Sequence, residues 1–263
     1  MQKTIVFITL ILTFMVVSSF NPEKVCKYKM KTIVIDPGHG GNDPGTLGKS
    51  SKEKDIALAV SLELGRIIQK NLPEIKVVYT RSSDKFVELY KRAEIANKNQ
   101  ADLMISIHCN AVPKKGNNWQ SVHGTEIYIM GNHKSEENLE VARRENAVIF
   151  DEANYKTNYD GFDPNSPESN ILLSLSQEVH VKNSLNLASK MDNQFETRVK
   201  RKSRGVKQAG FVVLAKTALP SVLVELGFLS NLEEEKFLKD AMGQVYMASA
   251  IFRAIREYKE ELE

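Results

Sequence analysis

The sequence predicts an α/β fold: a single three-layer domain with a mostly parallel or mixed sheet and helices on both of its faces. Short β-branched apolar runs alternate along the chain with longer stretches of helical spacing, which is typical of such a sheet. The 263 residues are 42% hydrophobic, enough for one sizeable core. No internal repeat and no low-complexity tract divides the chain, so we expect one domain over residues 31–263.

The strands are predicted from apolar runs of four to six residues bounded by turn residues. These runs cover residues 31–36, 76–80, 103–107, 125–130, 211–214 and 222–225. The helices are predicted from apolar residues repeating every three or four positions. They cover residues 53–72, which Pro73 ends, residues 86–99, and a closing helix over residues 232–262.

The segment 131–204 does not fit the alternation of strands and helices. It contains two helix-like runs, 138–150 and 168–199, joined by a turn-rich stretch over 159–167. Because that stretch is long for a simple connection, we expect the segment to be a lid or a regulatory insertion.

The first twenty residues resemble a secretory signal peptide. Lys3 precedes an apolar run that ends in the small residues Ser18 and Ser19. An uncleaved membrane anchor is the alternative, because the run is nearly long enough to span a bilayer. We expect a signal over 1–20, a linker over 21–30, and no stable membrane span after removal of the signal. The destination is then a periplasm or, alternatively, the cell wall or the outside of the cell.

The overall charge and the positions of the two cysteines argue against nucleic-acid binding and against a disulfide bond. A net charge of +3, without a cluster of basic and aromatic residues, argues against nucleic-acid binding. Cys26 lies in the tail before the domain and Cys109 at a predicted strand end, so two unpaired thiols are expected rather than a disulfide.

Two histidines stand at the ends of predicted strands, where α/β sheets bind ligands. His39 follows Ile33–Asp36 in a glycine-rich turn, and His108 ends the run at 103–107. Glu53 lies between them in sequence. Two imidazoles and one carboxylate make up an open catalytic zinc site, whereas magnesium and calcium prefer oxygen ligands. Taken singly, each residue has a structural reading: a turn histidine, a core histidine, and for Glu53 a capping box with Ser50.

The alternation of side chains along a strand predicts which residues next to His108 face the site. Cys109 is expected to face away from His108, and Asn110 to share the His108 side. Asp36 precedes the turn that holds His39 and could fix the tautomer of its imidazole.

Glu225 closes an otherwise apolar strand, 222–225. A buried, unpaired charge is costly, so either a basic partner or a function is implied. The functional reading is a general base with a pKa raised by apolar surroundings, which accepts the proton of a water molecule at the metal.

The ordered motifs of the chain resemble those of zinc-dependent N-acetylmuramoyl-L-alanine amidases, which trim peptidoglycan in wall turnover and daughter-cell separation. The resemblance covers about residues 31–258. Its landmarks are Asp36-Pro37-Gly38-His39-Gly40-Gly41, Glu53-Lys54-Asp55, Ser106-Ile107-His108-Cys109-Asn110-Ala111, Gly124-Thr125-Glu126, Arg204-Gly205-Val206-Lys207 and Val224-Glu225-Leu226-Gly227-Phe228-Leu229-Ser230-Asn231. One departure is Cys109, where the family usually has alanine.

The resemblance implies one zinc ion bound by His39, Glu53 and His108, Glu225 as the catalytic carboxylate, and a largely six-stranded sheet. The substrate it implies is the amide bond between N-acetylmuramic acid and L-alanine of peptidoglycan. Arg204 and Lys207 could contact stem-peptide carboxylates, with solvated surface charges as the alternative.

Some relatives carry an inserted helix that covers the zinc until a protein activator displaces it. In this chain such a lid would lie in 131–204, with Glu168 or Glu178 at the open zinc position. Two rival functions remain: another zinc peptidase of wall peptides, and a catalytically silent wall-binding regulator.

Overall fold

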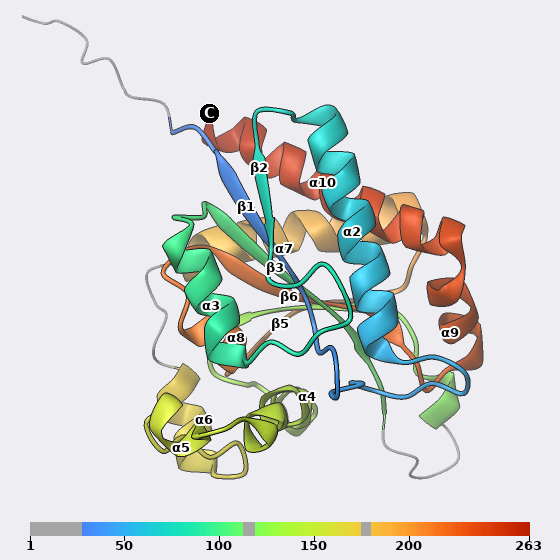
Figure 1. The fold of residues 1–263 in the computed structure, drawn as a ribbon. Coiled ribbons are helices and arrows are strands. Elements are labelled where there is room, and N and C mark those ends of the chain that lie inside the picture. The colour runs from blue at the N-terminus through green and yellow to red at the C-terminus, as the bar shows by residue number, and fades with distance from the viewer. Residues whose placement is uncertain (1–27, 113–118, 175–179) are drawn as a thin grey trace, which may run out of the picture.

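The computed structural model describes residues 28–112, 119–174 and 180–263, and it confirms the predicted α/β fold (Figure 1). One six-stranded sheet has the strand order β2–β1–β3–β6–β4–β5. Strands β2, β1, β3 and β6 are parallel, β4 runs antiparallel to β6, and β5 is parallel to β4. The strands are β1 (Thr32–Pro37), β2 (Lys76–Tyr79), β3 (Leu103–Asn110), β4 (Thr125–Met130), β5 (Ser203–Ala209) and β6 (Ser221–Phe228).

One predicted strand was wrong. Residues 211–214 fall mostly in a single helical turn, α8 (Val212–Ala215), whose side chains are buried against the sheet. The sixth strand is instead β5, which the apolar pattern missed because this edge strand is polar and mostly half-buried. A short apolar run does not by itself distinguish a strand from a buried helical turn.

Different helices cover the two faces of the sheet. Helices α2 (Glu53–Asn71), α7 (Val181–Gln194) and α10 (Ala241–Leu262) pack on one face, and α3 (Leu89–Lys98) and α8 pack on the other. Strand alternation decides which side chains each face receives. Cys109 belongs to the core under α2 and α10, so His108 and Asn110 point to the opposite face, as predicted.

The predicted closing helix is broken in two. It consists of α9 (Leu232–Lys239) and α10, separated by Asp240. The Asp240 carboxylate accepts a hydrogen bond from the Gly243 N–H and caps α10. The helices α2 and α3 match their predicted runs within a few residues.

The insertion 131–204 does not form two helices that cover one another. Helix α4 (Glu136–Asn146), the 3₁₀ turn η2 (Ala147–Asp151), α5 (Tyr155–Asn158) and α6 (Pro167–Ser174) gather at the lower end of the molecule in Figure 1. Helix α7 and the π turn η3 (Phe195–Val199) instead belong to the core on the α2 and α10 face. The predicted helical run 168–199 therefore includes α6 on one side of the sheet, and α7 and η3 on the other.

Several predictions concern parts of the chain outside the described residues. The signal peptide, Cys26 and Glu178 all lie there. Cys109 is a free, buried thiol. Among the described helices, none is long and apolar enough to cross a membrane.

Candidate metal centre

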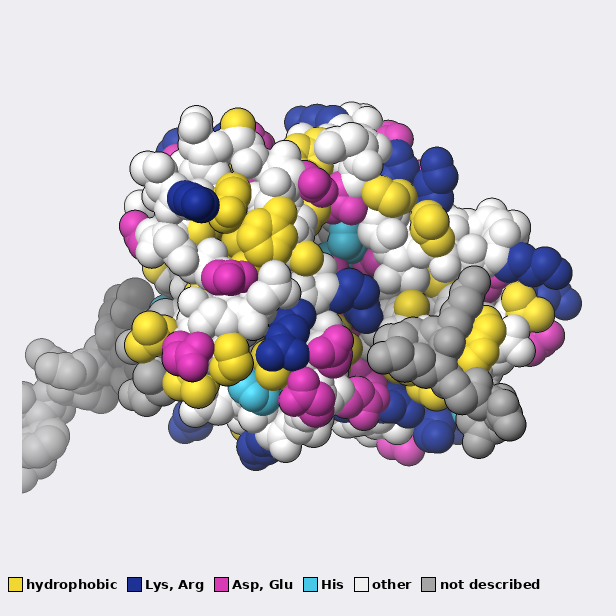
Figure 2. Space-filling model, turned by 90° about the horizontal axis from the view of Figure 1, so that it is seen from below, with side chains coloured by type: hydrophobic (Ala, Val, Ile, Leu, Met, Phe, Trp, Pro, Cys, Tyr) yellow, Lys and Arg dark blue, Asp and Glu magenta, His cyan; other side chains and the backbone are white. Residues whose placement is uncertain are grey.

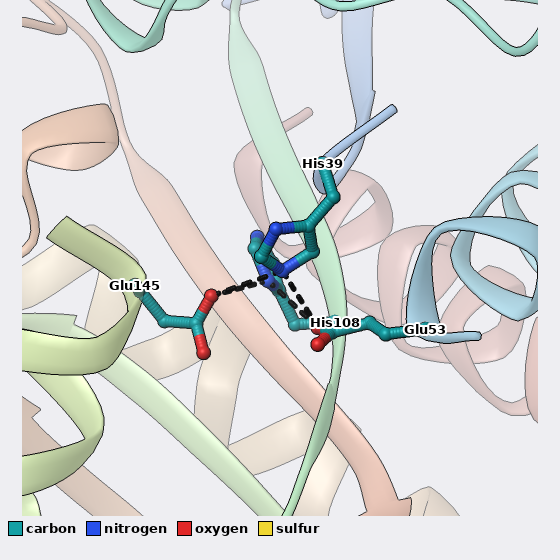
Figure 3. Close-up of side chains that lie close together, drawn as sticks. All are labelled: His39, Glu53, His108 and Glu145. Carbon is teal, nitrogen blue, oxygen red and sulfur yellow. Dashed lines mark hydrogen bonds and ion pairs between the residues drawn. The ribbon is translucent and has the colours of Figure 1, made fainter. Parts of the chain in front are cut away.

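Four buried side chains from four separate elements converge at the carboxyl ends of the central strands (Figure 3). His39 lies in the turn after β1, Glu53 opens α2, His108 lies near the end of β3, and Glu145 comes from α4. One possible ligand atom from each residue lies within 4.8 Å of all the others. The structure therefore brings together the three predicted ligands and adds Glu145 as a fourth.

The distances within this cluster are those of a compact cation site. His39 Nε2 lies 3.1 Å from Glu53 Oε1 and 3.1 Å from Glu145 Oε2. His108 Nδ1 lies 3.1 Å from the same two oxygens. His39 Nε2 and Glu145 Oε2 are buried without a well-formed hydrogen bond. Two imidazoles and two carboxylates with such unused atoms fit a zinc ion.

The ionisation of the cluster reflects its paired charges. Burial opposes charge on His108, but the Glu145 and Glu53 carboxylates raise its pKa to about 9. Burial likewise opposes charge on Glu53, but His39 lowers the pKa of that carboxyl to about 2. Without metal, protons therefore occupy the imidazoles between ionised carboxylates, where a cation would otherwise bind.

Glu53 does not use its carboxylate to cap its own helix. Helix α2 has no side-chain cap, and the Ser50 N–H donates to Glu235 instead. The carboxylate of Glu53 accepts hydrogen bonds from the Thr46 N–H at 2.7 Å and the Cys109 N–H at 2.8 Å. These bonds aim it into the cluster, so the capping-box reading is wrong.

The partner of His39 is Asp43, and the predicted role of Asp36 in fixing this imidazole was wrong. His39 Nδ1 donates to Asp43 Oδ2 at 2.7 Å, which leaves Nε2 facing the cluster. Asp36 instead accepts from the Ser106 hydroxyl at 2.6 Å, and Ser106 Oγ lies 3.1 Å from His108 Nε2. Asp36 thus orients the other histidine, His108, through Ser106.

Two buried arginines hold the turn that carries His39. Arg92 donates to Asp36 Oδ1 at 2.9 Å and to the carbonyl oxygens of Pro37 and His39 at 2.7 and 2.8 Å. Arg81 donates to the carbonyl oxygen of Pro37 at 3.0 Å and to that of Gly38 at 2.6 Å. The role of neither arginine was predicted, because the sequence does not show which buried basic residues reach the turn.

Glycines let the ligands approach the backbone closely. A Cβ atom at Gly38 would lie 2.5–2.8 Å from the ring of His108. A Cβ atom at Gly45, where φ is +65°, would lie 2.6 Å from His39 and 2.7 Å from Glu53 Oε2. These two positions require glycine for steric reasons, and Gly45 also for its left-handed backbone.

Glu225 lies on β6 beside this cluster and is fully buried. Among the described residues, none forms a hydrogen bond with either of its carboxylate oxygens, and Arg144 Nη2 lies 3.5 Å from Oε1. Burial, followed by repulsion from Glu145, raises the pKa of Glu225 well above its ordinary value. This is the environment expected of a general base.

Asn110, Arg204 and Lys207 meet at a carboxylate that the prediction did not include, Glu126 of β4. All three donate to it, Asn110 at 2.8 Å and the two cations at 2.6 Å each. Glu126 could have been found by the same signal as Glu225, a carboxylate within a buried apolar strand.

Glu168, predicted as a possible ligand, does not reach the cluster. It is exposed on α6 and accepts a hydrogen bond from the Ser166 hydroxyl. The carboxylate from this segment that lies in the cluster is Glu145, although nothing in its polar surroundings in the sequence marks it.

The mouth of the site is a cavity of about 250 Å³ beside α4, lined by His39, Asp43, Gly45, Thr46, Arg144, Glu145, Ala147, Val148 and Asp151. Figure 2 views the molecule from this end and shows histidine recessed among acidic and basic side chains.

Comparisons with known proteins agree on one family. A sequence model of N-acetylmuramoyl-L-alanine amidases matches residues 33–257. The amidase AmiA of Escherichia coli is 35% identical over 233 residues, which cover 87% of this chain and 76% of AmiA. A crystal structure of an N-acetylmuramoyl-L-alanine amidase from Clostridium difficile superposes with a TM-score of 0.66 at 26% identity, covering 90% of this chain and all of that one. The CwlD amidase of Clostridioides difficile, solved in complex with the GerS lipoprotein, gives a TM-score of 0.63 at 27% identity, covering 88% and 99% of the two chains.

Proposed function

This chain belongs to the N-acetylmuramoyl-L-alanine amidase family, and we propose that a zinc ion held by His39, Glu53 and His108 supports its reaction, with Glu225 as the catalytic carboxylate. Its enzyme class is that of a peptidoglycan hydrolase, which cleaves the amide bond between N-acetylmuramic acid and L-alanine. The convergence of two imidazoles and two carboxylates in one buried cluster carries the metal part of this proposal.

When bound, the metal ion would supply a Lewis acid for the scissile carbonyl and for water. The residues of this chain supply the rest. His39 Nε2, His108 Nδ1 and Glu53 would hold the ion, and the Asp43 and Ser106 contacts fix the two imidazoles. Glu225 accepts a proton from the attacking water and returns it to the nitrogen of L-alanine, because burial and the neighbouring Glu145 raise the pKa of its carboxyl and favour the protonated form.

Within the segment 131–204 the lid is helix α4, because α4 carries Glu145, whereas α7 and η3 belong to the core. A catalytic zinc site keeps one position open for water or substrate, and three of the four carboxylates and imidazoles here suffice to hold the metal. We assign Glu145 to the fourth position in a closed, inactive state. Helix α4 also places Arg144 at 3.5 Å from Glu225, so the same helix covers both the metal and the base.

Because the closed state is inactive, α4 must move before substrate can bind. We therefore extend the proposal to a protein activator that displaces α4. The CwlD amidase of Clostridioides difficile was solved in complex with a lipoprotein, which shows that a structural neighbour binds a protein partner. The signal-like residues 1–20 support export, to a periplasm or to the cell wall, and a role in wall turnover and daughter-cell separation.

The test is digestion of purified peptidoglycan by the chain from Asn21 onward, with mass spectrometry of the products. We expect chelator-sensitive release of intact stem peptides that begin with L-alanine, and more of it from Glu145→Gln than from the unaltered chain. Cleavage within the stem peptide would instead indicate a zinc peptidase. Zinc binding without any cleavage, even in Glu145→Gln, would indicate a wall-binding regulator.

A further inference from the structure

Glu126 anchors two cations at the edge of the sheet next to the proposed active site. This fully buried carboxylate accepts hydrogen bonds from Asn110, from the Tyr128 hydroxyl at 2.8 Å, and from Arg204 Nε and Lys207 Nζ at 2.6 Å each. Burial alone would raise its pKa, but Lys207 and Arg204 hold it below its ordinary value. Glu126 therefore stays ionised and fixes both cations in place.

The second partner of these cations comes from the lid. Arg204 Nη2 lies 2.7 Å from Glu137 Oε1 on α4, and Lys207 Nζ lies 3.8 Å from the same oxygen. The Glu137 side chain is 54% exposed, whereas those of Arg204 and Lys207 are only 21% and 15% exposed. The two cations and two carboxylates balance only while α4 is in place. When α4 leaves, the two cations at this half-buried position share a single carboxylate, that of Glu126.

This position lies within reach of a peptide attached at the scissile bond. Glu126 on β4 pairs residue for residue with Glu225 on β6, and Arg204 and Lys207 come from β5, the next strand beyond. Neighbouring strands are about 4.8 Å apart, so β5 runs roughly 10 Å from β6. An extended peptide covers about 3.5 Å per residue. The residues that follow L-alanine can therefore reach the two cations.

Helix α4 covers a similar distance to that between β6 and β5. Glu137 and Glu145 are eight residues apart on α4, which corresponds to about 12 Å along a helix. One carboxylate of α4 thus lies at the metal cluster and another at the cations on β5.

We propose that Arg204 and Lys207 form a binding site for a free carboxylate of the stem peptide, and that Glu137 occupies this site in the closed form as an internal substitute. The inference rests on the proposed function, since it takes a stem peptide as the substrate. Its consequence is that α4 and the substrate compete for the same two cations, so substrate binding and lid opening favour each other.

The test uses two probes that differ only at the carboxylate: N-acetylmuramoyl-L-alanyl-D-glutamate and the same compound with its α-carboxylate converted to an amide. Binding of each is measured by calorimetry with chelator-treated protein, in which cleavage does not interfere. We expect Glu137→Gln to bind the acid about ten-fold more tightly than the unaltered chain, because the internal competitor is gone. Binding of the amide should change little.

The matched control is Glu140→Gln, on the same helix. Glu140 pairs with Arg143 at 3.0 Å and is 60% exposed, so this substitution removes a carboxylate without touching the cations. It should leave both affinities unchanged. Lys207→Met should weaken binding of the acid and spare that of the amide, and Arg204→Lys, which keeps the charge, should have a smaller effect on the acid than Lys207→Met.

Equal affinities for acid and amide in every variant, or equal effects of Glu137→Gln and Glu140→Gln, would overturn the carboxylate site. Cleavage of the two probes by zinc-loaded Glu145→Gln protein, in which the inhibiting contact of α4 is removed, is a separate readout. If Glu137→Gln binds the acid selectively but zinc-loaded Glu145→Gln cleaves neither probe, the carboxylate site stands and the proposed amidase reaction fails. Cleavage of both probes without selective binding of the acid would mean that the amidase reaction stands and the carboxylate site fails.

Discussion

Glu126 and Glu225 face each other across the antiparallel strands β4 and β6, and of the two only Glu126 accepts hydrogen bonds from side chains in the described part of the chain. Both carboxylates are fully buried. Burial acts on both, but Lys207 and Arg204 hold the pKa of Glu126 below its ordinary value, whereas Glu225 has its pKa raised. Pairs of carboxylates whose environments separate their pKa values mark a division of roles. Here one anchors cations and the other is free to exchange a proton.

Glu225→Gln should lower kcat by about 10²–10⁴-fold, because the amide has the shape of the carboxylate but cannot accept the proton of water. Zinc content should stay at one ion per chain, since Glu225 is not among the cluster residues. The measurement is turnover of peptidoglycan together with metal analysis of the same preparation. Full activity in a zinc-loaded Glu225→Gln protein would exclude the proposed general base.

Glu145→Gln should raise the basal rate by roughly ten-fold or more in the absence of any partner, because it weakens the contact of α4 with the metal cluster. The rate of peptidoglycan cleavage measures this effect. Glu140→Gln is the control, since it changes the charge of α4 equally but lies away from the cluster. A Glu145→Gln rate at or below that of the control would mean that α4 does not inhibit.

The stability of the metal-free protein should fall as the pH rises from 6.5 towards 9. Burial opposes the charged form of His108, but Glu145 and Glu53 raise its pKa from the ordinary 6.5 to about 9. The folded chain therefore holds a proton that the unfolded chain releases over this range. Its contribution to stability is complete below pH 6.5 and is lost as the pH passes the folded pKa.

Thermal unfolding of chelator-treated protein across this pH range is the measurement. The zinc-loaded protein should show the opposite trend below neutral pH, because protons and metal compete for the same imidazoles. Unfolding midpoints of the metal-free protein that rise with pH would contradict the assigned cluster.

Local sequence patterns could predict those site residues that place a polar, ionisable side chain at the end of an apolar run. His39, His108 and Glu225 each end such a run, and the structure places them together. Glu145 could not be predicted in this way, because it lies on a polar helix whose position depends on packing between distant segments. The edge strand β5 was missed for a related reason: its side chains bind cations and carboxylates rather than a core, so it shows no apolar alternation.

Long-range contacts explain the remaining errors. Asp36 was expected to act on the histidine nearest in sequence, but the sheet places Ser106 and Arg92 beside it instead. The choice between cap and ligand for Glu53 was likewise decided by distant groups, the backbone N–H groups of Thr46 and Cys109.

Arg92 is expected to position His39, a proposed metal ligand. It is nearly inaccessible, and its guanidinium bridges Asp36 Oδ1 and the carbonyl oxygens of Pro37 and His39. His39 itself has a left-handed backbone, with φ of +58°, which this turn must maintain. Lysine carries one nitrogen in place of the planar fork and cannot reproduce these contacts. Arg92→Lys should therefore weaken zinc binding by roughly 10–100-fold.

Competition with a chromophoric chelator measures this zinc affinity independently of turnover. Arg66→Lys is the control, because Arg66 lies on the exposed side of α2, where it pairs with Glu63. A spectrum of the cobalt-substituted protein adds a readout that a general loss of stability would not change, since it reports the ligand geometry. If Arg92→Lys lowers the unfolding midpoint but keeps both the zinc affinity and the cobalt spectrum, Arg92 supports only the fold. A changed spectrum with weaker zinc binding is the outcome that the buried contacts of Arg92 predict.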